Sequence, residues 1–301
     1  MYRAEKLYEK FKDQPLKYPI CVPSYSRPNN ALIEWVKKPG WNIPKNKLVF
    51  FIRNTPEQRE MYKPIQKYAR IVLIPASTKD LGETRMHIVN WGIKHHHEVL
   101  FMLDDRVNGI WWLNKVVRNG KLYLDVDTQS TPADAFKIWA HQHRKNKMLL
   151  TGIGNKGFHW MPELINAPIE PLNGGFPGVA VAVSPMEFAK HGVNYAPISE
   201  RGVEDVNIIY QLLIRRLPFC MLHDVCYNQT KPCTTGGDSA VHPGMTRNER
   251  LTLIKQGFWE KTLGLPWGTP HPGFRIVQRK NESNIILVNY PYWRYLYDNP
   301  E

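Results

Sequence analysis

Residues 100–106 read Leu-Phe-Met-Leu-Asp-Asp-Arg, an apolar run that ends in two adjacent carboxylates. The run is typical of a buried strand, and two neighbouring acids at its end are costly to bury unless a cation compensates them. Open α/β folds bind their ligands at the carboxyl ends of parallel strands. Asp104 and Asp105 therefore predict a site for a divalent metal ion or a cationic substrate. The alternative is that both are solvated residues of a turn.

Strands alternate with helices on both sides of this run. Strands are expected at 18–23, 47–53, 70–75 and 99–103, and helices at 1–17, 30–38, 57–68 and 82–97. Such alternation predicts an α/β fold, with a mostly parallel sheet flanked by helices. The second half is less regular. It is expected to hold helices at 132–146 and 204–216, strands at 148–151, within 174–183 and at 219–225, and loops at 231–244 and 264–273.

Composition narrows the class of protein. The chain has 301 residues, of which 43% are hydrophobic and 22% charged, so it can bury a sizeable core. No apolar run approaches the roughly 20 residues of a membrane span, and the charged amino terminus lacks the apolar core of a signal peptide. Four unevenly spaced cysteines suit a reducing compartment. We expect a cytoplasmic protein without a membrane segment, in the host cytoplasm if it is viral.

The net charge of +13 is concentrated in the first third of the chain. Residues 1–103 hold 18 Lys and Arg against 9 Asp and Glu, a surplus of +9. Such a surplus favours polyanionic partners, which include nucleotides, nucleic acids and anionic surfaces. No single basic run carries it, so a disordered basic arm is not expected.

Polar side chains follow each of the first four expected strands. They are Ser24 and Arg27, then Arg53, then the segment 79–85, and finally the acid pair. In a parallel sheet these strand ends all face one edge. Arginine matches phosphate oxygens through its planar fork, and hard cations take carboxylate oxygens as ligands. Any one arginine is more simply explained as a surface charge, but together they predict a cleft for a diphosphate bridged by a metal ion.

Three motifs at this edge resemble the donor-binding half of GT-A glycosyltransferases. They are Val22-Pro-Ser-Tyr-Ser-Arg-Pro28, Leu81-Gly-Glu-Thr-Arg85 and Met102-Leu-Asp-Asp-Arg106, and the resemblance covers about residues 18–106. It implies that the first segment cradles a nucleotide base and that the second approaches the nucleotide. The acid pair is then implied to hold the ribose and a metal ion.

The resemblance also implies roles for single residues. Asp104 would orient the ribose, and Asp105 would bind Mn²⁺ or Mg²⁺. Arg106 stands where the family often has a third acid, which leaves the metal ligation open. The residues expected to bind the nucleotide sugar are Pro23, Ser24, Tyr25, Arg27, Arg53, Gly82, Arg85, Asp104, Gly174 and Gly175.

The second half offers acids for a different purpose. Arg201-Gly-Val-Glu-Asp-Val-Asn207 opens an amphipathic helix and resembles the Glu-Asp element that supplies the base in many inverting GT-A enzymes. A helix amino terminus stabilises carboxylates, so Asp205, or failing it Glu204, is the expected catalytic base. The alternative is an ordinary acidic first turn. His223 follows a short strand where family enzymes often place a histidine, and it is the second expected metal ligand.

More narrowly, the motifs resemble the TET/JBP-associated glycosyltransferases, a phage-rich group thought to decorate hydroxymethylated pyrimidines in DNA. That resemblance implies a metal-dependent, inverting transfer from a nucleotide-diphosphate sugar, with UDP the commonest carrier, to a DNA acceptor. We expect one GT-A-like domain over residues 1–301. Its parts are a nucleotide-sugar-binding half at 18–106, a decorated acceptor and catalytic part at 107–244, and a carboxyl-terminal extension at 245–301.

Two other functions remain open at this point. Asp104, Asp105, Glu204 and Asp205 would suit a metal-dependent nuclease that hydrolyses DNA without a sugar donor. The basic charge alone would suit a non-catalytic nucleic-acid-binding protein. The oligomeric state, the sugar and the acceptor are not encoded in any motif that we find.

Three further patterns are better explained as structural. Gly152-Ile-Gly-Asn-Lys-Gly157 matches the dinucleotide fingerprint, but the residues after it are a poor helix start. Cys220, His223, Cys226 and Cys233 lack the Cys-x-x-Cys spacing of a zinc site. His95-His-His97 precedes a buried strand and is expected at a helix end, where cations are favoured.

Overall fold

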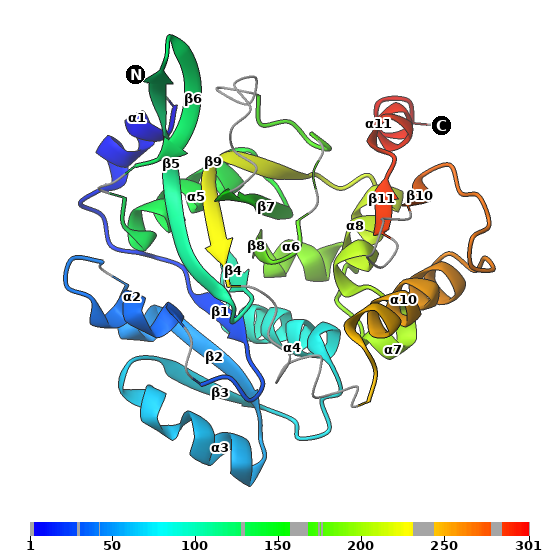
Figure 1. Ribbon diagram of the computed structural model, residues 1–301, viewed down its shortest axis with the longest axis horizontal. Helices are drawn as coiled ribbons and strands as arrows, with labels where there is room; N and C mark the ends of the chain where they lie inside the picture. Colours follow the sequence, from blue (N-terminus) through cyan, green and yellow to red (C-terminus); the bar gives the residue numbers. More distant parts are fainter. Residues whose placement is uncertain are drawn as a thin grey trace.

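The computed structural model describes residues 3–28, 31–41, 43–127, 130–156, 168–173, 175, 177–230, 244–277 and 285–300. At its centre is a nine-stranded sheet in the order β3-β2-β1-β4-β8-β7-β9-β5-β6, with helices on both faces (Figure 1). A separate two-stranded hairpin, β10–β11, lies near the carboxyl terminus. The two halves expected from the sequence therefore contribute strands to the same sheet.

The first four strands of the sheet are parallel to one another. They are β1 (Ile20–Pro23), β2 (Leu48–Arg53), β3 (Arg70–Ile74) and β4 (Leu100–Leu103). β1 pairs with β2 on one side and with β4 on the other, so the carboxyl ends of all four strands face the same edge. This arrangement brings the four polar strand ends together, as the sequence predicts.

The other five strands extend the sheet beyond β4. They are β5 (Val107–Arg118), β6 (Lys121–Val126), β7 (Leu150–Asn155), β8 (Ala180–Val183) and β9 (Phe219–Gln229). β8 is antiparallel to β4 and β7, and β5 is antiparallel to β9 and β6, so these two strands run against the other seven. The prediction of a mostly parallel sheet flanked by helices is confirmed.

The hairpin of β5 and β6 is absent from the sequence prediction. Arg118 pairs with Lys121 across a two-residue turn formed by Asn119 and Gly120. Both turn residues have positive φ, 51° and 72°. Asn-Gly flanked by strand-forming residues is a strong hairpin signal because a type I′ turn needs positive φ at both positions. The signal was therefore present in the sequence.

Successive side chains of a strand point to opposite sides, and the strands β1, β2, β4 and β8 are buried along almost their whole length, so this part of the sheet is buried on both faces. In β4, Phe101 and Leu103 belong to one buried cluster, and Leu100 and Met102 belong to the other. Each fully buried large apolar side chain contributes about 1.5–3 kcal/mol. The strand that ends in the acid pair is therefore firmly anchored.

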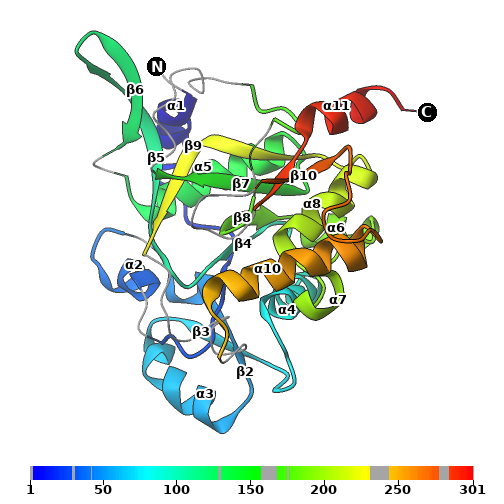
Figure 2. The same cartoon turned by 45° about the vertical axis from the view of Figure 1, so that its right-hand side comes forward.

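Different helices cover the two faces (Figures 1 and 2). The first face carries α1 (Arg3–Phe11), α2 (Glu34–Lys37), α3 (Pro56–Tyr62) and α5 (Pro132–Lys145). The second carries α4 (Leu81–Lys94), α6 (Pro185–Lys190) and α8 (Glu204–Ile214). Short 3-10 turns at Ala31–Ile33, Lys45–Lys47 and Lys63–Lys67 link elements of the first half. α1 is shorter than the helix predicted at 1–17, whereas the 3-10 turn Ala31–Ile33 and α2 together span most of the helix predicted at 30–38.

The carboxyl-terminal extension packs on the second face. It consists of α10 (Arg247–Gly257), a π-helical turn η6 (Phe258–Thr262), β10 (Phe274–Val277), β11 (Ile285–Val288) and α11 (Tyr290–Asp298). In both views α10 lies along the short helix α7 (Ile198–Arg201) (Figures 1 and 2). The predicted loop at 264–273 is confirmed, and most of the loop predicted at 231–244 falls outside the described residues.

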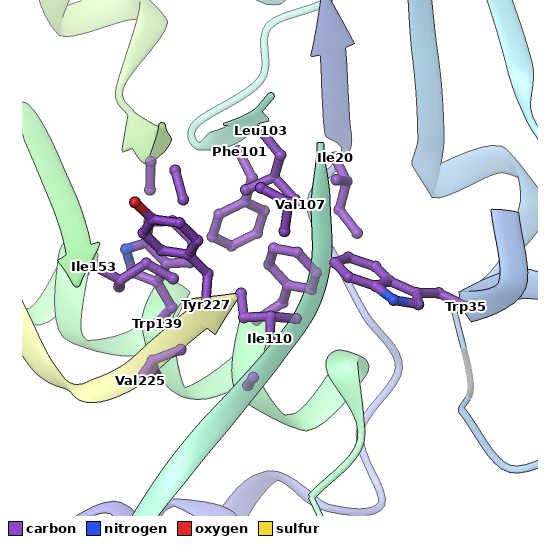
Figure 3. Close-up of a cluster of buried hydrophobic side chains, with 14 of the residues drawn as sticks. Ile20, Trp35, Phe101, Leu103, Val107, Ile110, Trp139, Ile153, Val225 and Tyr227 are labelled. Atoms are coloured by element: carbon purple, nitrogen blue, oxygen red, sulfur yellow. The ribbon is translucent and has the colours of Figure 1, made fainter. Parts of the chain in front are cut away.

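Figure 3 shows a buried aromatic and aliphatic cluster that includes residues on either side of the acid turn. Leu103 and Val107, which flank Asp104 and Asp105, both belong to it and are fully buried. Phe101 is among their neighbours in the cluster.

In the described part of the chain, no helix is long and apolar enough to cross a membrane.

Candidate functional site

The acid pair lies in a tight turn between β4 and β5. The backbone N–H of Val107 donates to the carbonyl of Asp104 at 3.0 Å and closes the turn, and the N–H of Asp104 donates to the carbonyl of Val179 at 3.0 Å. Asp105 is only 8% exposed. The alternative of two solvated turn residues is therefore half right: these are turn residues, but they are largely withdrawn from solvent.

Asp105 is bound by residues that follow β1. Its Oδ2 accepts a hydrogen bond from the Ser24 hydroxyl at 2.9 Å, and its Oδ1 accepts one from the Arg27 guanidinium at 3.0 Å. Burial raises the pKa of Asp105, and the contacts with Arg27 and Ser24 act in the opposite direction. The acid that the sequence offers as a metal ligand thus has both of its oxygens engaged by the chain itself.

Helix α3 holds the segment that follows β1. The Tyr62 hydroxyl lies 2.6 Å from the Ser24 hydroxyl and accepts the backbone N–H of Arg27 at 3.0 Å. Gln58 accepts the N–H of Ser26 and donates to its hydroxyl, which secures Ser26 at a φ of 56°. Neither of these two helix residues, whose side chains fix the predicted nucleotide-binding segment, stands out in the sequence.

The ends of β1, β2 and β3 are also in contact with one another. The guanidinium carbon of Arg53, at the end of β2, lies 4.4 Å above the ring of Tyr25. Arg53 also donates to the carbonyl of Lys79, beyond β3, at 2.6 Å. The structure therefore brings together the predicted nucleotide-binding residues Ser24, Tyr25 and Arg27 with Arg53 and the acid pair, and Pro23 is the last residue of β1.

Arg85 connects the two halves of the site. Projecting from α4, it donates to Asp104 Oδ1 at 3.0 Å and to the carbonyl of Gly178 at 3.2 Å, and it lies 3.4 Å from Glu204 Oε1. The residue is 3% exposed. Burial by itself would lower the pKa of Arg85, but the carboxylates of Asp104 and Glu204 outweigh it and raise that pKa.

Glu204 and Asp205 occupy the first turn of α8, as the sequence predicts. Asp205 Oδ1 accepts the backbone N–H of Val206 at 2.8 Å. Burial and the neighbouring Asp205 raise the pKa of Glu204 to about 8, although Arg85 opposes the shift. Burial likewise raises the pKa of Asp205. Both shifts favour the protonated form of these acids, and the shift of Glu204 moves its pKa toward neutral pH, the range in which a general acid or base works best.

The segment before α8 is fixed to the start of α4. Asp80 caps α4 by accepting the N–H of Glu83 at 3.0 Å, and its other oxygen accepts the N–H of Ile198 at 2.7 Å. A Cβ at Gly82 would overlap the carbonyl of Ala196. Gly82 therefore permits a close approach between these two segments, and its proposed contact with a nucleotide stays a prediction.

Tyr195 is a further residue that the sequence analysis missed. Its ring centroid lies 5.8 Å from the Arg85 guanidinium carbon, and its side chain is buried. It thus covers the cation that joins the two halves of the site, on the side of the segment that leads to α8.

Of the predicted glycine pair, Gly174 lies outside the described residues. Gly175 has a φ of 82°, and a Cβ there would overlap the side chain of Met221. Its carbonyl accepts a hydrogen bond from the Tyr290 hydroxyl of α11. The close approach expected at this glycine is thus one to protein atoms, and its contact with a donor sugar stays a prediction.

The predicted metal ligands are not clustered. No three His, Cys, Asp or Glu side chains within the described ranges converge so that they could hold a metal ion by themselves. His223 lies in β9 where its register with β7 shifts, since Ile153 pairs with Leu222 but Gly154 pairs with Cys226. Metal binding by Asp105 and His223 stays a prediction.

Asp104 has the donor chemistry for a hard cation. Its side chain is 16% exposed against 7% for Asp105, and its Oδ2 lies 3.9 Å from the Arg106 guanidinium, beyond hydrogen-bond range. A carboxylate oxygen of this kind is the ligand that Mg²⁺ and Mn²⁺ prefer. The site fits a metal ion that takes Asp104 from the chain and its remaining ligands from a bound diphosphate.

The patterns interpreted as structural lie in structural settings. Gly152 and Gly154 are inside β7 rather than in a turn that opens a helix. Cys220 and Cys226 are buried free thiols of β9, while Cys233 is outside the described residues. His95 caps the carboxyl end of α4, and its ring packs against Trp91 at 4.9 Å.

The nuclease alternative is not supported by the arrangement of the four acids. Two-metal hydrolysis needs carboxylates that share metal ions. Here Arg85 stands between Asp104 and Glu204, and Asp105 is bound by Arg27 and Ser24.

Neither a family model nor a curated protein matches the chain. Similar solved structures include S. aureus TarS 1–349 in complex with UDP-GlcNAc, with a TM-score of 0.48, 13% identity, and coverage of 83% of this chain and 67% of that one. They also include glucosyl-3-phosphoglycerate synthase from Mycobacterium tuberculosis with Mg²⁺ and UDP, with a TM-score of 0.46, 9% identity, and coverage of 97% and 96%. Likeness of this degree does not establish an activity, so the function has to follow from the chemistry of the site.

Proposed function

We propose that this chain is a glycosyltransferase that moves a sugar from a nucleotide-diphosphate sugar, such as a UDP-sugar, to an acceptor hydroxyl. The observation that carries the proposal is Arg85, a buried cation that contacts Asp104 on one side and Glu204 on the other. Arg85 thus joins Asp104, at the arginine-rich edge of the sheet, to the acid pair Glu204 and Asp205, whose pKa values are raised. Group transfer needs both parts next to each other.

The donor is proposed to bind along the edge formed by the ends of β1 to β4. Tyr25, stacked on Arg53, offers a flat surface for a base, and the arginines supply positive charge for the diphosphate. Asp104 would orient the ribose and share a Mn²⁺ or Mg²⁺ ion with the diphosphate oxygens. A bound divalent ion supplies charge neutralisation for the departing diphosphate. Asp105, bound by Ser24 and Arg27, would hold the donor segment in place.

Asp205 is proposed as the general base, with Glu204 held beside it by Arg85. Asp205 would take the proton of the acceptor hydroxyl while the acceptor oxygen bonds to the anomeric carbon. The bond from that carbon to the diphosphate oxygen would break, and its electron pair would leave with the diphosphate. An in-line displacement of this kind inverts the anomeric centre.

The test is a donor screen. The protein is incubated with Mn²⁺ and a panel of nucleotide sugars, and release of free nucleoside diphosphate is measured alongside thermal shifts. A nucleotide at 100 times its Kd should stabilise the fold by about 2.7 kcal/mol. No shift and no release with any nucleotide or nucleotide sugar would contradict the proposal.

The acceptor is proposed to be a hydroxymethylated pyrimidine in DNA. The support is the sequence resemblance together with the basic charge. Diphosphate release that depends on hydroxymethylated DNA and not on plain DNA would support this acceptor. Diphosphate release that depends on neither DNA would contradict the DNA acceptor, but it would not contradict the proposed glycosyltransferase activity.

A further inference from the structure

The π-helical turn η6 of the carboxyl-terminal extension grips the segment that carries Glu204 and Asp205. The Thr262 hydroxyl donates to the carbonyl of Arg201 at 2.7 Å and accepts from the Asn207 side-chain amide at 3.0 Å. One hydroxyl thus ties down both flanks of the acid pair. A hydroxyl has a single proton to donate, and Thr262 donates it to the carbonyl of Arg201, in the segment before the acid pair.

Two further contacts secure the segment before the acids. Lys261 Nζ donates to the carbonyl of Ser199 at 2.6 Å. Gly202 has a φ of 78° and ψ of −137°, and a Cβ there would overlap the backbone nitrogen of Phe258. Only glycine adopts such a backbone readily. Backbone and side-chain contacts therefore both fix how the chain enters α8.

On the far side of the acid pair, the hydrogen bonds continue from Asn207 into the interior of the protein. Asn207 is 2% exposed and its Oδ1 accepts from Gln211 Nε2 at 2.7 Å. Gln211 in turn donates to the carbonyl of Asn194 at 2.8 Å and accepts its N–H at 3.1 Å. Asn194 adjoins Tyr195, the ring that covers Arg85. A chain of buried hydrogen bonds therefore runs from Thr262 to the neighbourhood of the cation that joins the two halves of the site.

The turn that bears Thr262 is itself rigidly held. Phe258 and Trp259 are fully buried, and the Trp259 indole donates to the carbonyl of Thr269 at 3.1 Å. Phe258 packs edge-on against Phe274 of β10 with ring centroids 5.4 Å apart. Single π-helical turns are rare and are found frequently at functional sites. The rigid turn can therefore fix the positions of Arg201 and Asn207, which Thr262 contacts.

We propose that Thr262 is a positioning residue of the transfer reaction, and that the carboxyl-terminal extension is part of the active site because it sets the placement of Glu204 and Asp205. This inference rests on the proposed function, in which Asp205 is the base. A displacement of about 1 Å in such a group can cost roughly 100-fold in rate. Loss of one bifunctional hydroxyl is expected to lower kcat by roughly 10- to 100-fold.

The experiment compares Thr262→Val with two matched variants. Thr262→Ser keeps the hydroxyl, and Thr252→Val makes the same chemical change on the neighbouring helix α10. For each, kcat, the KM for the donor and backbone hydrogen exchange in residues 199–207 are measured. We expect Thr262→Val to speed exchange in this segment and to lower kcat with the donor KM unchanged. Thr262→Ser should keep the hydrogen exchange of residues 199–207 and kcat close to their wild-type values. Thr252→Val should change neither the exchange nor kcat.

Unchanged exchange in 199–207 would overturn the inference, and so would faster exchange with an unchanged kcat. The exchange measurement needs no substrate. If the wild-type protein transfers no sugar at all, the proposed function fails on that result, while the exchange data show separately whether Thr262 holds the segment.

Discussion

The chain contains two pairs of adjacent acids in the site, and their surroundings differ. In the turn after β4, each acid contacts an arginine: Arg27 contacts Asp105, and Arg85 contacts Asp104. At the start of α8, Glu204 shares Arg85 with Asp104, and burial raises the pKa of Glu204 to about 8. The turn pair is compensated by fixed cations, whereas the helix pair is only partly compensated.

Under the proposed function, this difference separates the roles of the two pairs. Carboxylates that are matched by cations serve as fixed charges, which position loops, ribose or metal ions. Carboxylates with raised pKa values can gain and lose protons near neutral pH. Pairs of titratable groups whose environments differ in this way are how active sites divide charge stabilisation from proton transfer.

The largest expected effect comes from removing the cation that the two pairs share. Arg85→Met leaves the carboxylate of Asp104 without its buried cation, and removing one partner of a buried ion pair costs about 3–5 kcal/mol. Urea unfolding measures the loss. The matched control is Arg144→Met, because Arg144 pairs with Glu98 at a half-exposed position where about 0–1 kcal/mol is expected. Equal losses in the two variants would contradict the role given to Arg85.

The next effect is a pH dependence of stability to which Glu204 contributes, because burial raises its pKa to about 8. Glu204 keeps its proton in the folded protein up to about pH 8 but loses it near its ordinary pKa of 4.5 when unfolded. The folded state therefore binds more protons in this window, and stability should fall as the pH rises from about 5 to 8. Glu204→Gln should flatten that slope in urea unfolding at a series of pH values. A slope identical to that of the wild-type protein would show that Glu204 is not the group responsible.

A smaller effect is expected on the side of the turn pair. Tyr62→Phe removes the hydroxyl that contacts Ser24 and accepts the N–H of Arg27. Leaving a buried partner unsatisfied should cost about 1–2 kcal/mol and weaken nucleotide binding, because the donor segment loosens. Tyr68→Phe, at the residue that follows the 3-10 turn Lys63–Lys67, is the control and should change stability by less than about 0.5 kcal/mol. A Tyr62→Phe protein that binds nucleotide like the wild type would remove Tyr62 from the donor site.

Much of the donor edge could be predicted because parallel strands force it. Once β1 to β4 were inferred, Ser24, Arg53 and Asp104 had to share an edge. The nature of the compensating cation could not be predicted in this way. The sequence suggests that a metal ion or a cationic substrate balances the acid pair. In the structure the cations are Arg27 and Arg85, whose positions depend on contacts far apart along the chain.

The remaining gaps have different causes. The hairpin around Asn119 and Gly120 was missed although its local signal is strong. Tyr62, Tyr195 and Thr262 could not be found from the sequence, since each acts through a partner far away along the chain. The periodicity of a segment does not reveal such partners. The proposed contribution of the carboxyl-terminal extension to the site belongs to this second kind.

The division of labour between the two acid pairs can be tested by one calorimetric comparison. Binding of the nucleoside diphosphate of the active donor, with and without Mn²⁺, is measured for Asp104→Asn and Asp205→Asn, together with sugar transfer. We predict that Asp104→Asn loses the Mn²⁺-dependent part of binding. We predict that Asp205→Asn binds like the wild type but transfers roughly 10²- to 10⁴-fold more slowly. Mn²⁺-dependent binding retained by Asp104→Asn, or wild-type transfer by Asp205→Asn, would contradict the account.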